Sequence, residues 1–363
     1  MIKLLIGGSP CTFWSVAQKN NRETQAEGMG WELFKNYLIA KQKFKPDFFL
    51  YENNKSAAQP IKDQISQELE VPLMYINSAL VSAQNRERFY AFNWFVDMPE
   101  DRGIVLYDII EPTTGEKNYE LKTVGVGYRN RREDDGRLYR RFETHGQEKA
   151  NALTTVQTDS MVAEPIRVGD IGSTAQAHRV YSCDGKSRVL IANAGGQGGK
   201  TGLYACPSDC KCGQCIYEVK GGQIEIKGKK YPIRLPDGFY VIRKLTVTEC
   251  CRLQTLPDNY CRAVSKSQAY KGLGNGWTAE VIIHILNGVL KDVPRDEEIV
   301  VLSMYDGIGT GRYCLDKMGF KNVRYYAYEI DKYAKAVAMS NYPDIIQMGD
   351  AFDVRNSEWT VNV

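Results

Sequence analysis

The chain has 363 residues, of which 43% are hydrophobic and 25% charged, and its formal net charge is +3. This length allows one large domain or two ordinary ones with a substantial core, and the composition excludes a low-complexity chain. The longest apolar runs are strand-sized, and the apolar start at Ile2 lacks a signal-peptide cleavage pattern, so we expect a soluble, cytoplasmic protein with no membrane partner. Its ten cysteines are then expected to be reduced. The three histidines, His145, His178 and His284, have no ligand-like spacing, which disfavours imidazole general bases.

Strand and helix patterns alternate up to about residue 95. Buried strands are predicted at 2–6, 47–54 and 73–80. Helices are predicted at 31–42, where Trp31, Phe34 and Leu38 share one stripe, and at 59–69. This alternation implies an α/β fold with parallel strands and helical crossovers.

The pattern changes twice along the rest of the chain. Glycines and short alternating stretches dominate 107–242, which predicts a separate, irregular, β-rich lobe. Helices return at 243, with a capping box at Thr246 and Glu249, a second box at Ser265 and an apolar helix at 278–290. The charged, proline-broken stretch 291–298 is interpreted as a linker, and a new βαβαβ series follows it.

The last series opens with a strand, the turn "YDGIGTG" (Tyr305 to Gly311) and a helix. Glycines let the backbone approach a nucleotide-like ligand, although an ordinary tight connection has the same pattern. Glu329 ends the next strand, where it is placed to bind a ribose diol, and Asp350 ends the third, where it is placed to accept from an adenine amine. The "GDAFD" ending, with no phosphate-binding lysine, favours S-adenosylmethionine over a dinucleotide.

A basic stretch lies in the β-rich lobe. Residues 128–141 hold six arginines and two tyrosines, and Arg129, Arg131 and Arg132 are candidate DNA contacts. Three acidic residues in the stretch dilute the field, and a solvated loop or hairpin face is the alternative.

A cysteine cluster lies in the same lobe. Cys206, Cys210, Cys212 and Cys215 fall within ten residues, and four thiolates suit a structural zinc ion. The spacing is not the usual two CxxC pairs, so a disulfide or reduced loop cysteines stay open as alternatives.

Six blocks of the chain resemble those of the DNA (cytosine-5)-methyltransferases. They are "GGSPC", "YENN", "SAQNRERFY", "RKLTVTECCRLQTLPD", "LGNGWT" and "YDGIGTG". "MYDGIGTG" and "GNGWT" are similar to the animal de novo branch, whereas the overall texture is more similar to bacterial and phage enzymes, some with restriction partners. The resemblance implies a Rossmann-like S-adenosylmethionine-dependent sheet, a target recognition domain at 107–242, and a monomer that acts on double-stranded DNA.

The resemblance also implies the chemistry of four residues. Cys11 matches the nucleophile that adds to cytosine C6, and a strand-end turn beside positive charge favours its thiolate. Glu52 matches the acid that holds N3 and the exocyclic amine. Arg86 and Arg88 lie two residues apart, so in an extended segment both face the same side. They match the pair that contacts the cytosine carbonyl and orients the glutamate. A structural role is the alternative for Cys11, as is a salt bridge for Arg88.

Further positions follow from the same blocks. Residues 12–30 match a mobile loop that closes over a flipped base, with Ser15 as a phosphate contact. The predicted cofactor contacts are Pro10, Asn275, Trp277, Tyr305, Asp306, Gly307, Ile308, Gly309, Gly311, Glu329, Ile330 and Asp350.

The order of the blocks differs from that of most family members, which place the cofactor turn before the nucleophile. We therefore expect a circular permutation: a catalytic half at 1–106, the recognition domain at 107–242, closing helices at 243–290, a permutation linker at 291–298 and the cofactor half at 299–363. This predicts that the strand at Ile2 to Ile6 lies beside the cofactor strands. The predicted activity is sequence-specific cytosine C5 methylation, and the alternatives are a tRNA cytosine methyltransferase and a catalytically idle DNA-binding homologue.

Overall fold

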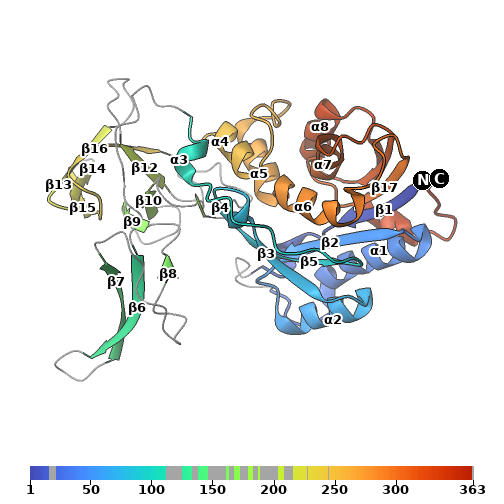
Figure 1. Ribbon diagram of the computed structural model, residues 1–363, viewed down its shortest axis with the longest axis horizontal. Coiled ribbons are helices and arrows are strands. Elements are labelled where there is room, and N and C mark those ends of the chain that lie inside the picture. The colour runs from blue at the N-terminus through green and yellow to red at the C-terminus, as the bar shows by residue number, and fades with distance from the viewer. Residues whose placement is uncertain are drawn as a thin grey trace. The chain divides into compact units, whose positions relative to one another are not determined.

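The computed structural model of the chain divides into two compact units (Figure 1). The first holds Met1–Ile104 and Thr246–Val363, and the second lies within Val105–Arg188 and Thr201–Leu245. The residues that the structure describes are 1–15, 22–111, 125–132, 138–145, 161–162, 167–171, 179–182, 187–188, 203–207, 216–226, 228–243 and 245–361.

The first unit is built on a seven-stranded sheet in the order β19-β18-β17-β1-β2-β5-β3. Its strands are β1 (Ile2–Gly7), β2 (Phe48–Asn54), β3 (Leu73–Asn77), β5 (Glu87–Phe92), β17 (Ile299–Met304), β18 (Val323–Tyr328) and β19 (Ile346–Gly349). β1 pairs in parallel with β17 on one side, from Ile2 with Ile299 to Gly7 with Met304, and with β2 on the other. The expectation that the first strand lies beside the late strands is confirmed.

Helices cover both faces of this sheet (Figure 1). α1 (Gly28–Phe44) and α2 (Gln59–Leu69) lie on one side, and α5 (Lys266–Asn275), α6 (Ala279–Leu290) and α7 (Thr310–Lys317) lie on the other. A strand buried on both faces needs a nearly continuous apolar run, which is why β1 and β17 read as "IKLLIG" and "IVVLSM". Every residue of β17 is buried. The remaining helix beside the cofactor strands is α8 (Lys332–Asn341).

Three local predictions have different outcomes. The capping box is confirmed at the start of α4 (Val247–Leu253), where Glu249 N donates to Thr246 Oγ1 and Thr246 N to Glu249 Oε2. The second box is wrong, because the Ser265 side chain makes no cap hydrogen bond and instead contacts Ser267 Oγ. The alternation had implied only parallel strands, but β5 enters antiparallel between β2 and β3.

Shorter elements connect these strands. η1 (Cys11–Phe13) follows β1, η2 (Ser78–Leu80) and β4 (Gln84–Asn85) precede β5, and η4 (Ala351–Arg355) follows β19. The stretch 291–298 runs as turns, in which the Arg295 guanidinium donates to the carbonyl oxygens of Leu290, Lys291 and Val293.

The described part of the second unit is mostly strand. One sheet has the order β7-β6-β8, and the other β15-β14-β13-β16-β12-β10-β9. A small core of Val168, Val180, Val219, Ile224 and Ile233 supports the second sheet. The elements are α3 (Leu106–Ile109), β6 (Gly125–Arg132), β7 (Leu138–His145), β8 (Met161–Val162), β9 (Arg167–Asp170), β10 (Arg179–Ser182), β11 (Ser187–Arg188), β12 (Leu203–Pro207), β13 (Ile216–Lys220), β14 (Gln223–Ile226), β15 (Lys229–Pro232) and β16 (Gly238–Arg243).

The described ranges contain neither a membrane-spanning helix nor a cluster of metal ligands. None of the helices in them has the length and apolar character that a membrane span needs. Within the same ranges, no three His, Cys, Asp or Glu side chains gather as metal ligands would.

Candidate active site

The chain turns sharply where β1 ends, and Cys11 opens the short helix η1 after that turn. The two glycines of the turn are required by close approach: a Cβ on Gly7 would lie 2.4 Å from Met304 O, and one on Gly8 would lie 2.5 Å from Glu52 O. Because these neighbours are backbone atoms of β17 and β2, they cannot easily move aside for a side chain at either glycine. The carbonyl oxygen of Cys11 accepts from Trp14 N and Ser15 N. The turn therefore holds Cys11 at the carboxyl edge of the central strands.

A buried polar network fixes this turn from β2. Asn53 Nδ2 donates to Ser9 O over 2.9 Å and to Tyr51 Oη over 3.0 Å. Ser9 Oγ and Tyr51 Oη lie 2.7 Å apart and share a hydrogen bond. Burial raises the pKa of Tyr51 well above its usual value, so the phenol stays neutral. Asn53 thus ties the strand that carries Glu52 to the turn that carries Cys11.

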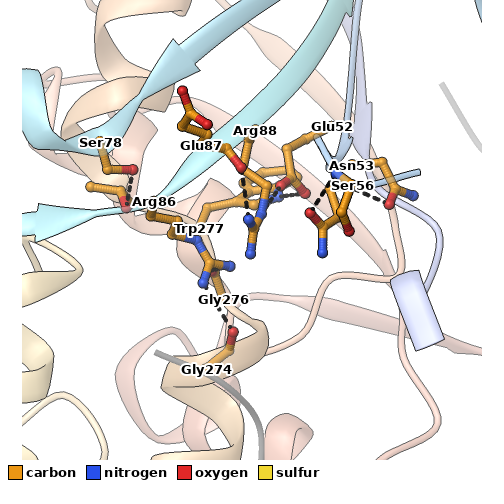
Figure 2. Close-up of polar contacts among 12 residues, drawn as sticks. Glu52, Asn53, Ser56, Ser78, Arg86, Glu87, Arg88, Gly274, Gly276 and Trp277 are labelled. Atoms are coloured by element: carbon orange, nitrogen blue, oxygen red, sulfur yellow. Dashed lines mark hydrogen bonds and ion pairs between the residues drawn. The ribbon is translucent and has the colours of Figure 1, made fainter. Parts of the chain in front are cut away.

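Glu52 lies on β2 with a separate donor for each carboxylate oxygen (Figure 2). Arg88 Nε, on β5, is 3.0 Å from Oε1, and Trp277 Nε1 donates to Oε2 over 3.1 Å. The carboxylate side chain is 12% exposed, so these charge-assisted contacts are only weakly screened. The sequence left a salt bridge as the alternative to a role of Arg88 in orienting Glu52. In the structure the same contact with Glu52 is a salt bridge and orients the carboxylate.

Arg86 does not share the direction of Arg88 (Figure 2). Its Nη1 donates to Gly274 O over 3.2 Å and its Nη2 to Gly276 O over 2.9 Å. Burial, with a smaller effect from Arg88, lowers the pKa of Arg86 to about 9, and the Glu52 carboxylate opposes that shift electrostatically. Arg86 thus anchors the loop after α5. The prediction that both arginines face one side described an extended segment, but residue 86 lies between β4 and β5.

The glycine-rich turn after β17 meets Glu329 at the end of β18. Tyr305 and Gly307 have positive φ values of 62° and 63°. Gly307 N donates to Glu329 Oε2 over 2.9 Å, while Ile330 N and Asp331 N donate to Oε1. Burial raises the pKa of Glu329. The turn after β17 and the end of β18 are thus joined by hydrogen bonds to the Glu329 carboxylate.

Asp306 is a buried carboxyl group in this turn. Its Oδ1 accepts from Ser303 Oγ over 2.7 Å and from Tyr325 Oη over 2.6 Å, and its Oδ2 is buried without a hydrogen-bond partner. Burial raises the pKa of Asp306 to about 6. Asp350 is exposed at the start of η4, where it accepts from Phe352 N.

One pocket of about 390 Å³ joins the two halves of this site. The sequence-predicted residues that line it are Pro10, Cys11, Glu52, Arg86, Arg88, Asn275, Trp277, Tyr305, Asp306, Gly307, Ile308, Glu329, Ile330 and Asp350.

Of the residues predicted in the first unit, Gly309, Gly311 and Ser15 do not line the pocket. Gly309 packs against Ala338 of α8, and a Cβ on Gly311 would lie 2.4 Å from Ile6 Cδ1, so both glycines serve close packing. Ser15 caps the turn at Cys11 instead.

Sequence reasoning missed several lining residues. Lys271 of α5 reaches Asp331 at the start of α8, over 2.6 Å, and the partly exposed rings of Tyr333 and Phe352 lie along the wall. Phe352 lies inside the quoted "GDAFD" motif, so its apolar character beside Asp350 was an available signal. The pairing of Lys271 with Asp331 depends on the fold and had no local signal.

The loop predicted at 12–30 is described in part, since residues 16–21 lie outside the described ranges. Its two ends are tied together: Trp14 is fully buried, and its Nε1 donates to Glu23 Oε2 over 3.0 Å. Gly30 N donates to the same carboxylate, and Arg22 Nη2 donates to Ser56 O. Closure of this loop over a base stays a prediction.

The predicted contacts in the second unit are less fully described. Arg129, Arg131 and Arg132 lie on β6, and Cys206 lies on β12. Cys210, Cys212 and Cys215 lie outside the described residues, so the zinc site gains no support from the structure.

Comparison with known proteins gives two matches. The family described as C-5 cytosine-specific DNA methylase matches residues 1–291 of this chain. The chain is also 29% identical over 133 residues to the type II methyltransferase M.HhaI of Haemophilus parahaemolyticus. That alignment spans 37% of this chain and 31% of the relative, so the chain covers about a third of the relative's length.

Proposed function

Because the chain belongs to the C-5 cytosine-specific DNA methylase family, we propose that it transfers a methyl group from S-adenosylmethionine to C5 of cytosine in double-stranded DNA. The observation that carries the proposal is the single pocket that holds a nucleophile, a base-binding carboxylate and a glycine-rich turn. It lies at the carboxyl ends of β17 and β1. From β17 the chain continues to β18 on one side of the sheet order, and from β1 it continues to β2 on the other side. Ligands of open α/β sheets bind at such a switch point.

The residues around the glycine turn fit the proposed cofactor. The positive φ of Gly307 opens the backbone to a ligand, Glu329 is placed for a ribose diol, and the exposed Ile330 and Phe352 provide apolar surface for a purine. The unpartnered Oδ2 of Asp306 suits a ligand that carries hydrogen-bond donors. When bound, the cofactor supplies an electrophilic methyl group on a sulfonium.

Cys11 and Glu52 divide the activation of the base between them. Cytosine C5 is a poor nucleophile, so the Cys11 thiolate first forms a bond to C6. Electron density then moves into the ring, where Glu52 holds N3 and the exocyclic amine. Arg88 holds Glu52 while it faces the base carbonyl, and Arg86 holds the loop that follows α5. C5 would then take up the methyl group, with the electron pair of the broken methyl–sulfur bond left on the cofactor. The C5 proton would pass to solvent, and the electrons of that C–H bond would re-form the C5–C6 double bond as the C6–sulfur bond breaks and releases the Cys11 thiolate.

DNA recognition is assigned to the second unit. A cytosine in a duplex is stacked and paired, so C5 chemistry requires the base to flip into the pocket. We expect Ser15 and the 12–30 loop to close over the flipped base, and Arg129, Arg131 and Arg132 on β6 are candidate contacts to the DNA backbone.

A circular permutation accounts for the order of the blocks. Counted from β17 as the first strand, the sheet order becomes 3-2-1-4-5-7-6, which is the doubly wound order with one antiparallel insertion. The family match ends at residue 291, and β17 begins at Ile299. The 291–298 stretch is then the joint between the ancestral ends.

The test uses the purified chain, labelled S-adenosylmethionine and an excess of mixed-sequence duplex DNA. We expect methyl transfer to DNA, an adduct with duplexes that contain 5-fluorocytosine, and the loss of both in Cys11→Ser. Bisulfite sequencing of DNA from expressing cells gives the target context. If the chain methylates tRNA in preference to duplex DNA, then tRNA is its substrate. If it binds DNA but forms no covalent adduct, the alternative of a catalytically idle homologue is supported.

A further inference from the structure

Trp277 makes its polar contact on the base side of the pocket, although its block predicts a cofactor contact. Its indole Nε1 donates to Glu52 Oε2 over 3.1 Å, opposite the contact of Arg88 with Oε1 (Figure 2). The carboxylate is thus held by donors from two distant segments of the chain. We propose that Trp277 is a positioning residue that fixes Glu52 for base binding, an inference that rests on the proposed function.

The backbone that carries Trp277 is fixed on both sides. Before it, Gly276 O accepts from Arg86 Nη2 over 2.9 Å and from Gln254 Nε2 over 3.3 Å. After it, the buried Thr278 donates from Oγ1 to Gln254 Oε1 over 2.9 Å and shares a hydrogen bond with Ser78 Oγ. A donor held in advance needs no ordering when the substrate binds. Trp277 is therefore preorganised toward Glu52.

Two roles of Trp277 can be distinguished by experiment. Asn275 and Trp277 line the same pocket as Tyr305 and Ile308 of the cofactor turn. A residue that serves only as a cofactor wall changes the affinity for S-adenosylmethionine. A residue that acts through Glu52 changes the rate at which Cys11 adds to the base, because that carboxylate stabilises the activated ring.

The test compares Trp277→Phe, which removes the N–H, with Trp277→His, whose Nε2 occupies the place of the indole Nε1 in the five-membered ring. We expect Trp277→Phe to slow adduct formation on 5-fluorocytosine duplex about tenfold, with less than a twofold change in the Kd for S-adenosylmethionine. Trp277→His restores most of the rate. Trp94→Phe is the control, since it removes an indole N–H that donates to Ile285 O over 2.9 Å outside the pocket, and it leaves the rate unchanged.

The possible outcomes separate the two proposals. An unchanged adduct rate in Trp277→Phe, or a slowed rate that tracks a weaker cofactor affinity and is not restored by His, overturns the positioning role. Thermal denaturation of each variant, compared with Trp94→Phe, shows whether a slowed rate reflects unfolding. If the unaltered chain forms no adduct and transfers no methyl group, the proposed function itself fails.

Discussion

Asn53 holds the backbone of Ser9, two residues before Cys11, through a hydrogen bond of 2.9 Å from its Nδ2 to the Ser9 carbonyl oxygen. Asn53 is 1% exposed, and the same nitrogen also contacts Tyr51 Oη. The amide is therefore a link between the strand that carries Glu52 and the turn that carries Cys11. Its loss affects both the stability of the fold and the position of Cys11.

The first prediction concerns this amide. Asn53→Ala removes the donor to the buried Ser9 carbonyl oxygen, which costs about 1–3 kcal/mol in the free energy of unfolding. We expect methyl transfer to fall at least tenfold at temperatures where the variant is fully folded, because Cys11 is misplaced. Asn93→Ala is the control: it also breaks two backbone hydrogen bonds, to Asp47 O and from Phe49 N, away from the pocket. Equal rates in the two variants would contradict the link.

The second prediction concerns the close approach at Gly8. An alanine Cβ there would lie 2.5 Å from Glu52 O and 3.1 Å from Glu52 Oε2, so Gly8→Ala has to displace Glu52, the proposed base-binding residue. We expect a loss of methyl transfer of about a hundredfold, or about 2.7 kcal/mol of transition-state stabilisation.

Gly103→Ala is the matched control for Gly8→Ala. Gly103 has a positive φ of 63° and no atom within 4 Å of an added Cβ, so its substitution costs only about 1 kcal/mol of backbone strain. Steady-state kinetics and urea denaturation of both variants check the comparison. Gly8→Ala with unchanged kinetics would show that Glu52 tolerates displacement.

The third prediction is a pH dependence that arises from Asp306. Burial raises its pKa from 3.8 to about 6, so between these values the folded chain keeps a proton that the unfolded chain has released. The free energy of unfolding therefore falls as the pH rises through this window, by about 3 kcal/mol in total. Urea denaturation at pH 4 and pH 7 measures the effect.

Asp306→Asn removes this titration, so the gap in stability between the variant and the unaltered chain changes by that amount between the two pH values. Asp292→Asn, at an exposed turn, is the control, and its stability follows that of the unaltered chain. Parallel pH curves for Asp306→Asn and the unaltered chain would mean that the carboxyl is not held protonated.

The fourth prediction follows from the proposed permutation. A chain that begins at Glu298, and in which residue 361 is joined to Ile2 by a Gly/Ser linker, keeps every pairing of the central sheet. We expect methyl transfer within about threefold of the original, since the pocket residues and their supports are unchanged. Loss of folding in this rearranged chain, but not in one that carries only the linker insertion at 291–298, would show that the block order is required.

Much of the sheet could be predicted from the sequence, because strands buried on both faces carry their own apolar signature, as β1 and β17 do. The glycine turn and Glu329 were also predictable, since backbone freedom and a strand-end acid are local features. The antiparallel position of β5 between β2 and β3 could not be predicted in this way. It depends on which strands pair with β5 in the folded chain, and the residue pattern of β5 itself does not encode that choice.

The same distinction between local and tertiary features applies to the candidate site. The membership of Cys11 and Glu52 in one pocket follows from strand ends that share an edge. The separate directions of Arg86 and Arg88 depend on the strand being interrupted at residue 86, between β4 and β5, and the contact of Trp277 with Glu52 depends on a loop far along the sequence. Such contacts are fixed by tertiary packing, and no spacing encodes them.

The pairing of β1 with β17 has a consequence for biosynthesis. β1 leaves the ribosome long before β17, so one edge of β1 stays unpaired while the chain between the two strands is made. An apolar strand with an open edge is a template for intermolecular association, and contacts between such distant segments form slowly. The nascent segment that carries β1 is thus a natural client for chaperones, whereas an order in which β17 directly precedes β1 would complete the same edge sooner.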